Sequence, residues 1–158
     1  MAPNPPAGGP RQDPLPMLQQ LYAGLYSPLT AMLQYRYQST VLAHCDPQLA
    51  QALACMAGVE AHHLEILGAL IASLGGTPAY STQAGPWTGQ QIYYGTAPCR
   101  ILLKDLAQKV EAVDRCLQAA GQLQDPRLSG VLKKLAEDQS AQVQLLQEMI
   151  RRRRCRRP

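Results

Sequence analysis

The sequence predicts an all-α protein, a four-helix bundle in which one long loop connects the second helix to the third. Two observations support this prediction. The 158 residues are rich in Leu and Ala, contain no Phe and only one Trp, and such a composition suits helices packed on helices better than a sheet. Four segments with apolar residues at helical spacing are also separated by breaks that contain Pro or Gly.

The first two predicted helices cover residues 16–44 and 47–74. The first is defined by apolar residues at helical spacing, and we leave open an adjustment near Pro28. The second begins after Asp46, which suits the N-cap, with Pro47 at its first position. It ends at the pair Gly75 and Gly76, a typical C-terminal stop.

The last two predicted helices are separated from the first two by a long crossover. The third helix covers 98–123, and the fourth starts at Pro126 behind the cap residue Asp125 and runs into the C-terminal arginines. Residues 75–96 lie between the two pairs, and a connection of 22 residues is too long for a tight turn. Two short hairpins joined by one crossover define this bundle.

The chain divides into a bundle, 17–150, and two short terminal segments. Residues 1–16 hold six of the thirteen prolines and are predicted to be a disordered arm. Residues 151–158, "RRRRCRRP", form an Arg-rich tail. Without the six arginines of this tail the net charge of +4 becomes −2, because nine basic residues remain against eleven acidic ones. The body of the protein is therefore mildly acidic.

Composition also restricts the location of the protein and the chemistry of its cysteines. No apolar run reaches the roughly 20 residues that a membrane span needs, and the N-terminus lacks the pattern of a signal peptide. These features predict a cytoplasmic protein. The five cysteines are dispersed, without a Cys-x-x-Cys motif, which argues against a disulfide framework, a zinc knuckle or a rubredoxin-type iron site.

One motif inside the second helix points to chemistry. In "GVEAHHLEILG", Glu60 and His63 stand three residues apart, so they share a helix face. Glu-x-x-His is the unit from which four-helix bundles build di-metal centres. The stretch that starts at Pro47 also repeats weakly from Pro126 onward, and this repeat places neutral Gln139 and Gln142 where the first copy has Glu and His.

Three stretches resemble the bacterial ferritin-like family related to rubrerythrin: "SPLTAMLQYRYQ" (27–38), "EAHHLEILGALIASLGGTPAY" (60–80) and "PWTGQQIYYG" (86–95). The resemblance implies a ferritin-like four-helix bundle with a long B–C crossover loop. It also implies two iron or manganese ions and an oxidase, peroxidase or catalase-like activity. Here B and C denote the second and third predicted helices.

The resemblance implies that most of the metal ligands have been replaced. Glu60 and His63 match the family's ligands in the second helix. Pro28 stands at the place of the first helix's carboxylate, Ala107, Gln108 and Lys109 at that of the third, and the two glutamines replace the pair in the fourth. Two of six ligands remain, too few negative groups to neutralise two divalent cations in a bundle interior.

Three functions follow as hypotheses. In the first, the di-metal oxidoreductase site is degenerate, the bundle has a structural or interaction role, and Glu60 and His63 hydrogen-bond to the two glutamines. In the second, a metal-dependent oxidoreductase or peroxidase holds a single iron or manganese ion on Glu60 and His63, with Glu111 as a third ligand. In the third, the tail, otherwise disordered, binds a polyanion through Arg151, Arg152, Arg153, Arg154, Arg156 and Arg157. A homodimer is a further expectation, since bundles of this kind often pair through helix faces.

Overall fold

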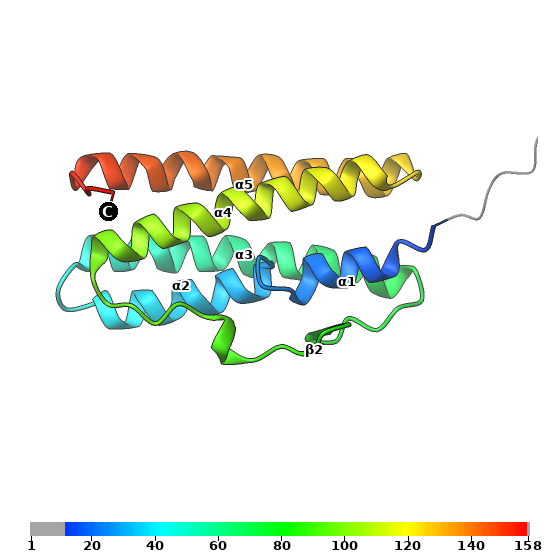
Figure 1. Cartoon of the computed structure of the whole chain (residues 1–158), viewed down its shortest axis with the longest axis horizontal. Coiled ribbons are helices and arrows are strands. Elements are labelled where there is room, and N and C mark those ends of the chain that lie inside the picture. Colours follow the sequence, from blue (N-terminus) through cyan, green and yellow to red (C-terminus); the bar gives the residue numbers. More distant parts are fainter. Residues whose placement is uncertain (1–11, 158) are drawn as a thin grey trace, which may run out of the picture.

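The computed structural model describes residues 12–157 and contains five α-helices. They are α1 (Leu15–Ala23), α2 (Pro28–Leu42), α3 (Pro47–Ser73), α4 (Pro98–Gln122) and α5 (Pro126–Arg152). Figure 1 shows α1 and α2 following one another along one edge of the bundle, so together they take the place of one long helix. The predicted all-α four-helix bundle is confirmed. Most of the predicted N-terminal arm lies outside the described residues, and α1 begins within its last two positions.

The first predicted helix is in fact two helices. Gly24 adopts an extended backbone after α1, and a side chain there would collide with the carbonyl oxygen of Gln20. The Ser27 hydroxyl then accepts a hydrogen bond from the Thr30 amide at 3.3 Å. Because Pro28 follows this cap directly, the chain starts a new helix there.

The helices pack as two pairs, α2 with α3 and α4 with α5. Their buried apolar side chains form two clusters at opposite ends of the bundle. One contains Leu67 and Leu132, and the other contains Leu53 and Leu146. Along the helices, buried polar residues lie between these clusters. Such a polar layer is costly unless its groups find partners, so it is the part of the core that requires an explanation.

The crossover lies along α1 and α2, and hydrogen bonds hold its second half against α2. It contains a two-stranded antiparallel ribbon, β1 (Ser81–Thr82) and β2 (Gly85–Pro86), and a short 3-10 helix (Gly89–Gln91). Trp87 Nε1 donates to the Thr30 hydroxyl at 2.9 Å, and the Tyr93 amide donates to Gln34 Oε1 at 2.8 Å. The long loop is thus an ordered part of the fold.

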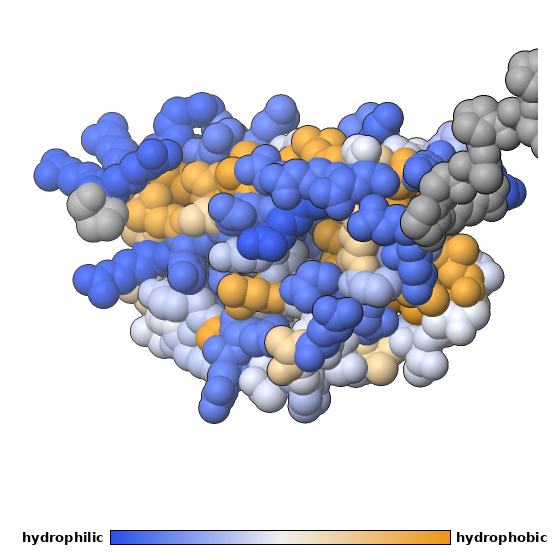
Figure 2. Space-filling model, turned by 45° about the vertical axis from the view of Figure 1, so that its right-hand side comes forward, coloured by the Kyte–Doolittle hydropathy of each residue, from blue (hydrophilic) through white to orange (hydrophobic). Residues whose placement is uncertain are grey.

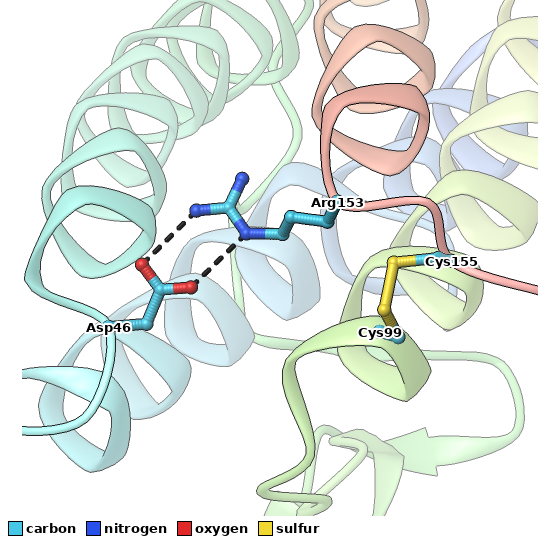
Figure 3. Close-up of a disulfide and its surroundings, with 4 residues drawn as sticks. All are labelled: Asp46, Cys99, Arg153 and Cys155. Atoms are coloured by element: carbon cyan, nitrogen blue, oxygen red, sulfur yellow. Dashed lines mark hydrogen bonds and ion pairs between the residues drawn. A yellow bond between two sulfur atoms is a disulfide. The ribbon is translucent and has the colours of Figure 1, made fainter.

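Residues 151–157 of the C-terminal segment are held by specific contacts, in contrast to the disordered tail that the sequence predicted. α5 continues to Arg152, and the Arg153 guanidinium then donates two hydrogen bonds of 3.1 Å to Asp46 (Figure 3). These bonds are the main reason why the pKa of Asp46 lies below its usual value. The same carboxylate caps α3 by accepting from the Leu49 amide at 3.0 Å. One acid therefore joins the start of α3 to the end of α5.

A disulfide between Cys99 and Cys155 corrects the expectation drawn from the dispersed cysteines (Figure 3). The two residues are 56 positions apart in the sequence. They meet because α4 and α5 form an antiparallel hairpin of two long helices, which returns the chain end to the start of α4. Cys45, Cys55 and Cys116 are free thiols.

α3 is the one described helix whose length and composition would allow a membrane span. Leu49, Leu53, Leu67 and Ile71 on this helix are nevertheless buried inside the bundle. A core helix of this kind passes the same test, so the finding is weak evidence for a membrane.

Candidate functional site

Glu60 and His63 lie together in the polar layer at the centre of the bundle. Their exposed fractions are 0% and 1%. Lys109 from α4 is also buried, and its Nζ donates a hydrogen bond to Glu60 Oε1 at 2.7 Å. The same ammonium lies 5.5 Å from the centre of the Tyr35 ring, a distance at which a cation is attracted to the ring face. The charge of Glu60 is therefore balanced by a buried lysine.

The electrostatics of Glu60 follow from this pair. Burial alone would raise the pKa of Glu60, because a carboxylate loses hydration in the core. The charge of Lys109 and the proximity of His63 outweigh burial and hold the pKa below its usual value. Glu60 and Lys109 thus form an ion pair with no net charge.

His63 lies between two carboxylates. Its Nδ1 is 3.7 Å from Glu60 Oε1 and its Nε2 is 3.4 Å from Asp138 Oδ2. Asp138 stands next to Gln139 in the sequence, and its side chain reaches the edge of the site. Asp138 is 37% exposed and also accepts a hydrogen bond from Lys134. A row of polar side chains therefore leads from the surface of α5 to the buried ion pair.

Gln139 and Gln142 are buried, but they do not form the predicted hydrogen-bonded network. Gln139 Oε1 and both polar atoms of the Gln142 side chain have no hydrogen-bond partner in the described part of the protein. Glu60 pairs with Lys109 instead. The sequence indicated correctly that these residues are polar and face inward, but the partners it implied are wrong.

Gln142→Leu is expected to leave the free energy of unfolding unchanged or to raise it. The amide of Gln142 is buried without hydrogen bonds, and an apolar side chain of similar size removes that desolvation cost. Urea denaturation of the variant and the wild type measures the effect. A loss of about 1–3 kcal/mol would mean that the amide has partners after all.

Asp105 is the functional-site residue that the sequence interpretation missed. It is 1% exposed, and its Oδ1 accepts hydrogen bonds of 2.8 Å from both Gln34 and Gln38 of α2. Burial raises the pKa of this carboxyl to about 7, although the two amides and Lys109 act in the opposite direction. One signal could have revealed it, because Asp105 and Lys109 are four residues apart and so share a helix face.

Because of the raised pKa of Asp105, we expect the free energy of unfolding to decline as the pH rises. Its folded-state pKa of about 7 lies above the ordinary 3.8, so the folded protein binds the proton more tightly than the unfolded chain. Its contribution is therefore most favourable below about pH 4 and is lost as the pH rises toward and through 7. Asp105→Asn should remove most of this decline, as measured by urea denaturation between pH 4 and 8. An equally steep decline in the variant would assign it to other groups.

The remaining candidate ligand, Glu111, does not reach the site. Its side chain is 51% exposed and lies 3.8 Å from Arg115. It stands two residues beyond Lys109, and helical residues that are two positions apart point to nearly opposite sides. Ala107 is also exposed, and Pro28 begins α2. Across residues 12–157, no three His, Cys, Asp or Glu side chains converge as a metal-binding set.

The side chains at this place do not fit a di-metal centre. A pair of divalent cations needs about four carboxylates, whereas only Glu60 and Asp105 are buried acids here. The negative charge of Glu60 is already paired with the Lys109 ammonium, whose Nζ lies 2.7 Å from Glu60 Oε1. The cavity beside Lys109 and Tyr35 has a volume of about 20 Å³, room for about one water molecule.

Comparison with solved structures places this arrangement in a known fold. KatB, a manganese catalase from Anabaena, superposes with a TM-score of 0.80 at 19% identity, over 98% of this chain and 82% of KatB. The Mycobacterium tuberculosis bacterioferritin BfrA gives 0.75 at 23% identity, over 89% and 87%. The bacterioferritin of Desulfovibrio desulfuricans, which has a diiron site, gives 0.74 at 21% identity, over 90% and 82%.

The chain therefore has the ferritin-like fold that the sequence predicted. No protein-family model and no curated protein sequence matches it. At these identities the likeness concerns the fold, so the function has to be argued from the side chains.

Proposed function

We propose that this protein is a ferritin-like bundle whose di-metal oxidoreductase site is degenerate, and that it has a structural or interaction role. The observation that carries the proposal is the hydrogen bond of 2.7 Å between Lys109 Nζ and Glu60 Oε1 in the bundle interior. An ammonium there supplies the positive charge that Glu60 needs. A metal ion is then not required to hold the bundle together.

Electrostatics support this role. A divalent cation that approached Glu60 would have to displace Lys109, whose charge would then be buried and unpaired. An uncompensated buried charge costs several kcal/mol. The cation would also find neutral amides where carboxylates are required, because Gln139 and Gln142 stand on the facing side of the bundle. Both terms oppose metal binding.

Thermal unfolding with and without metal tests the proposal against its main alternative, an oxidoreductase with a single iron or manganese ion on Glu60 and His63. A ligand that binds only the folded state raises the melting temperature. We expect the same melting temperature in EDTA, in Mn²⁺ and in anaerobic Fe²⁺. An increase in either metal that disappears in Glu60→Ala would favour the alternative.

A second candidate function, polyanion binding, is favoured by the exposed arginines at the end of the chain. Arg154, Arg156 and Arg157 form no ion pair among the described residues, whereas Arg153 is held by Asp46. We expect replacement of these three by Ser to lower the salt concentration that elutes the protein from heparin, with the disulfide and Arg153 intact. Arg36→Ser, on α2, is the control. Unchanged elution of the triple variant would rule this function out.

The cellular location remains a proposal. The sequence pattern predicts the cytoplasm, yet disulfides such as Cys99–Cys155 persist mainly in oxidising compartments. A homodimer is also part of the proposed interaction role, and the surface of α4 indicates how it would form.

A further inference from the structure

α4 carries an apolar stripe on the side that faces away from the core. Val110 and Leu117 are 41% and 49% exposed, and Ala107 is exposed one turn before Val110. Leu103, Leu106, Ala107 and Val110 line a groove with Gln147 of α5 and Arg157 of the C-terminal segment. Figure 2 shows hydrophobic surface between hydrophilic side chains in the upper half of the molecule, where α4 and α5 lie. No described element covers this stripe, so it is available to a partner.

Charged residues flank the stripe in a self-complementary order. Arg100 and Lys104 stand seven and three residues before Ala107, and Glu111 and Asp114 stand four and seven residues after it. All four are exposed. A helix with its basic residues before a central point and its acidic residues after it matches a copy of itself that runs in the opposite direction.

We propose that a second copy of this chain binds here, with the two α4 helices antiparallel around a twofold axis near Ala107. Lys104 then faces Glu111 of the second copy, and Arg100 faces its Asp114. Leu103 packs on Val110 across the axis. The small side chain of Ala107 allows the helices to approach closely at the centre. Each contact occurs twice, as an isologous interface requires.

The charge order favours this occupant over an acidic partner protein. An acidic helix would be attracted by Arg100 and Lys104 but repelled by Glu111 and Asp114 on the same stripe. The antiparallel copy pairs all four residues. The apolar residues recur as Leu103, Val110 and Leu117, seven positions apart, which is the period along which one helix packs on another.

Sedimentation equilibrium of the full chain tests the proposal. The wild type is expected to be a dimer, and Val110→Glu is expected to be a monomer because it buries a charge in the interface. Leu145→Glu is the matched control, since Leu145 is 43% exposed on α5 and does not line the groove. A wild type that stays monomeric would overturn the proposal, and so would a dimer that Val110→Glu does not weaken. A monomeric wild type that binds an added acidic peptide would likewise overturn it.

Charge reversal tests the register and does not depend on the folding of Val110→Glu. Lys104→Glu and Glu111→Lys should each raise the dissociation constant of the dimer about tenfold, since each change puts two pairs of like charges together. The double variant should return to the wild-type value. Mixing the two single variants should give a heterodimer, because every reversed residue then meets its opposite. Failure of both rescues would contradict the antiparallel arrangement.

Discussion

Lys109→Met should lower the free energy of unfolding by about 3–5 kcal/mol. The variant keeps the length of the side chain but removes the ammonium that donates to Glu60 Oε1. Glu60, with an exposed fraction of 0%, would then carry a charge without a partner. Urea denaturation at pH 7 measures the loss. The pKa of Glu60 should also rise, so the loss should become smaller at lower pH.

The double variant Glu60→Gln/Lys109→Met is the matched control. It removes both charges, and a buried ion pair can often be replaced by uncharged residues at little cost. We expect it to recover most of the stability that Lys109→Met loses. A single variant as stable as the wild type would mean that another cation balances Glu60.

Loss of the disulfide should have the next largest effect. The Cys99–Cys155 bond joins residues 56 positions apart, and closing a loop of that length stabilises the folded state by up to about 4 kcal/mol in the chain-entropy model. Replacing both cysteines by Ser should lower the free energy of unfolding by about 2–4 kcal/mol. Urea denaturation of the double variant provides the measurement.

Matched variants separate the disulfide from general effects of cysteine replacement. Cys45 and Cys55 are exposed free thiols, so Cys45→Ser and Cys55→Ser should leave stability unchanged. Dithiothreitol should destabilise the wild type and leave the Cys99→Ser/Cys155→Ser variant unaffected. A wild type that is equally stable in oxidised and reduced form would contradict a structural role for this bond.

The helices could be predicted because their signals are local. Asp46 and Asp125 accept hydrogen bonds from backbone amides at the starts of α3 and α5, as their positions before Pro indicated. The break at Gly24 was less visible, since apolar residues keep helical spacing on both sides of it. The shared helix face of Glu60 and His63 also followed from their spacing.

The partners of the buried polar groups could not be predicted, because they depend on how the helices are rotated against one another. The family resemblance placed the relevant position of α4 only within the range from Ala107 to Lys109. Residues two positions apart on a helix point in nearly opposite directions. Ala107 is exposed, whereas Lys109 is buried beside Glu60. The disulfide was missed for a similar reason, since it depends on the matched lengths of α4 and α5.

The metal content of the purified protein tests the central claim most directly. The protein is produced in medium supplemented with iron and manganese, and the number of metal ions per chain is measured by inductively coupled plasma mass spectrometry. If the Lys109 ammonium supplies the charge that Glu60 requires, iron and manganese should both remain far below one ion per chain. About two ions per chain in the wild type, with loss of this metal in Glu60→Ala, would contradict the account.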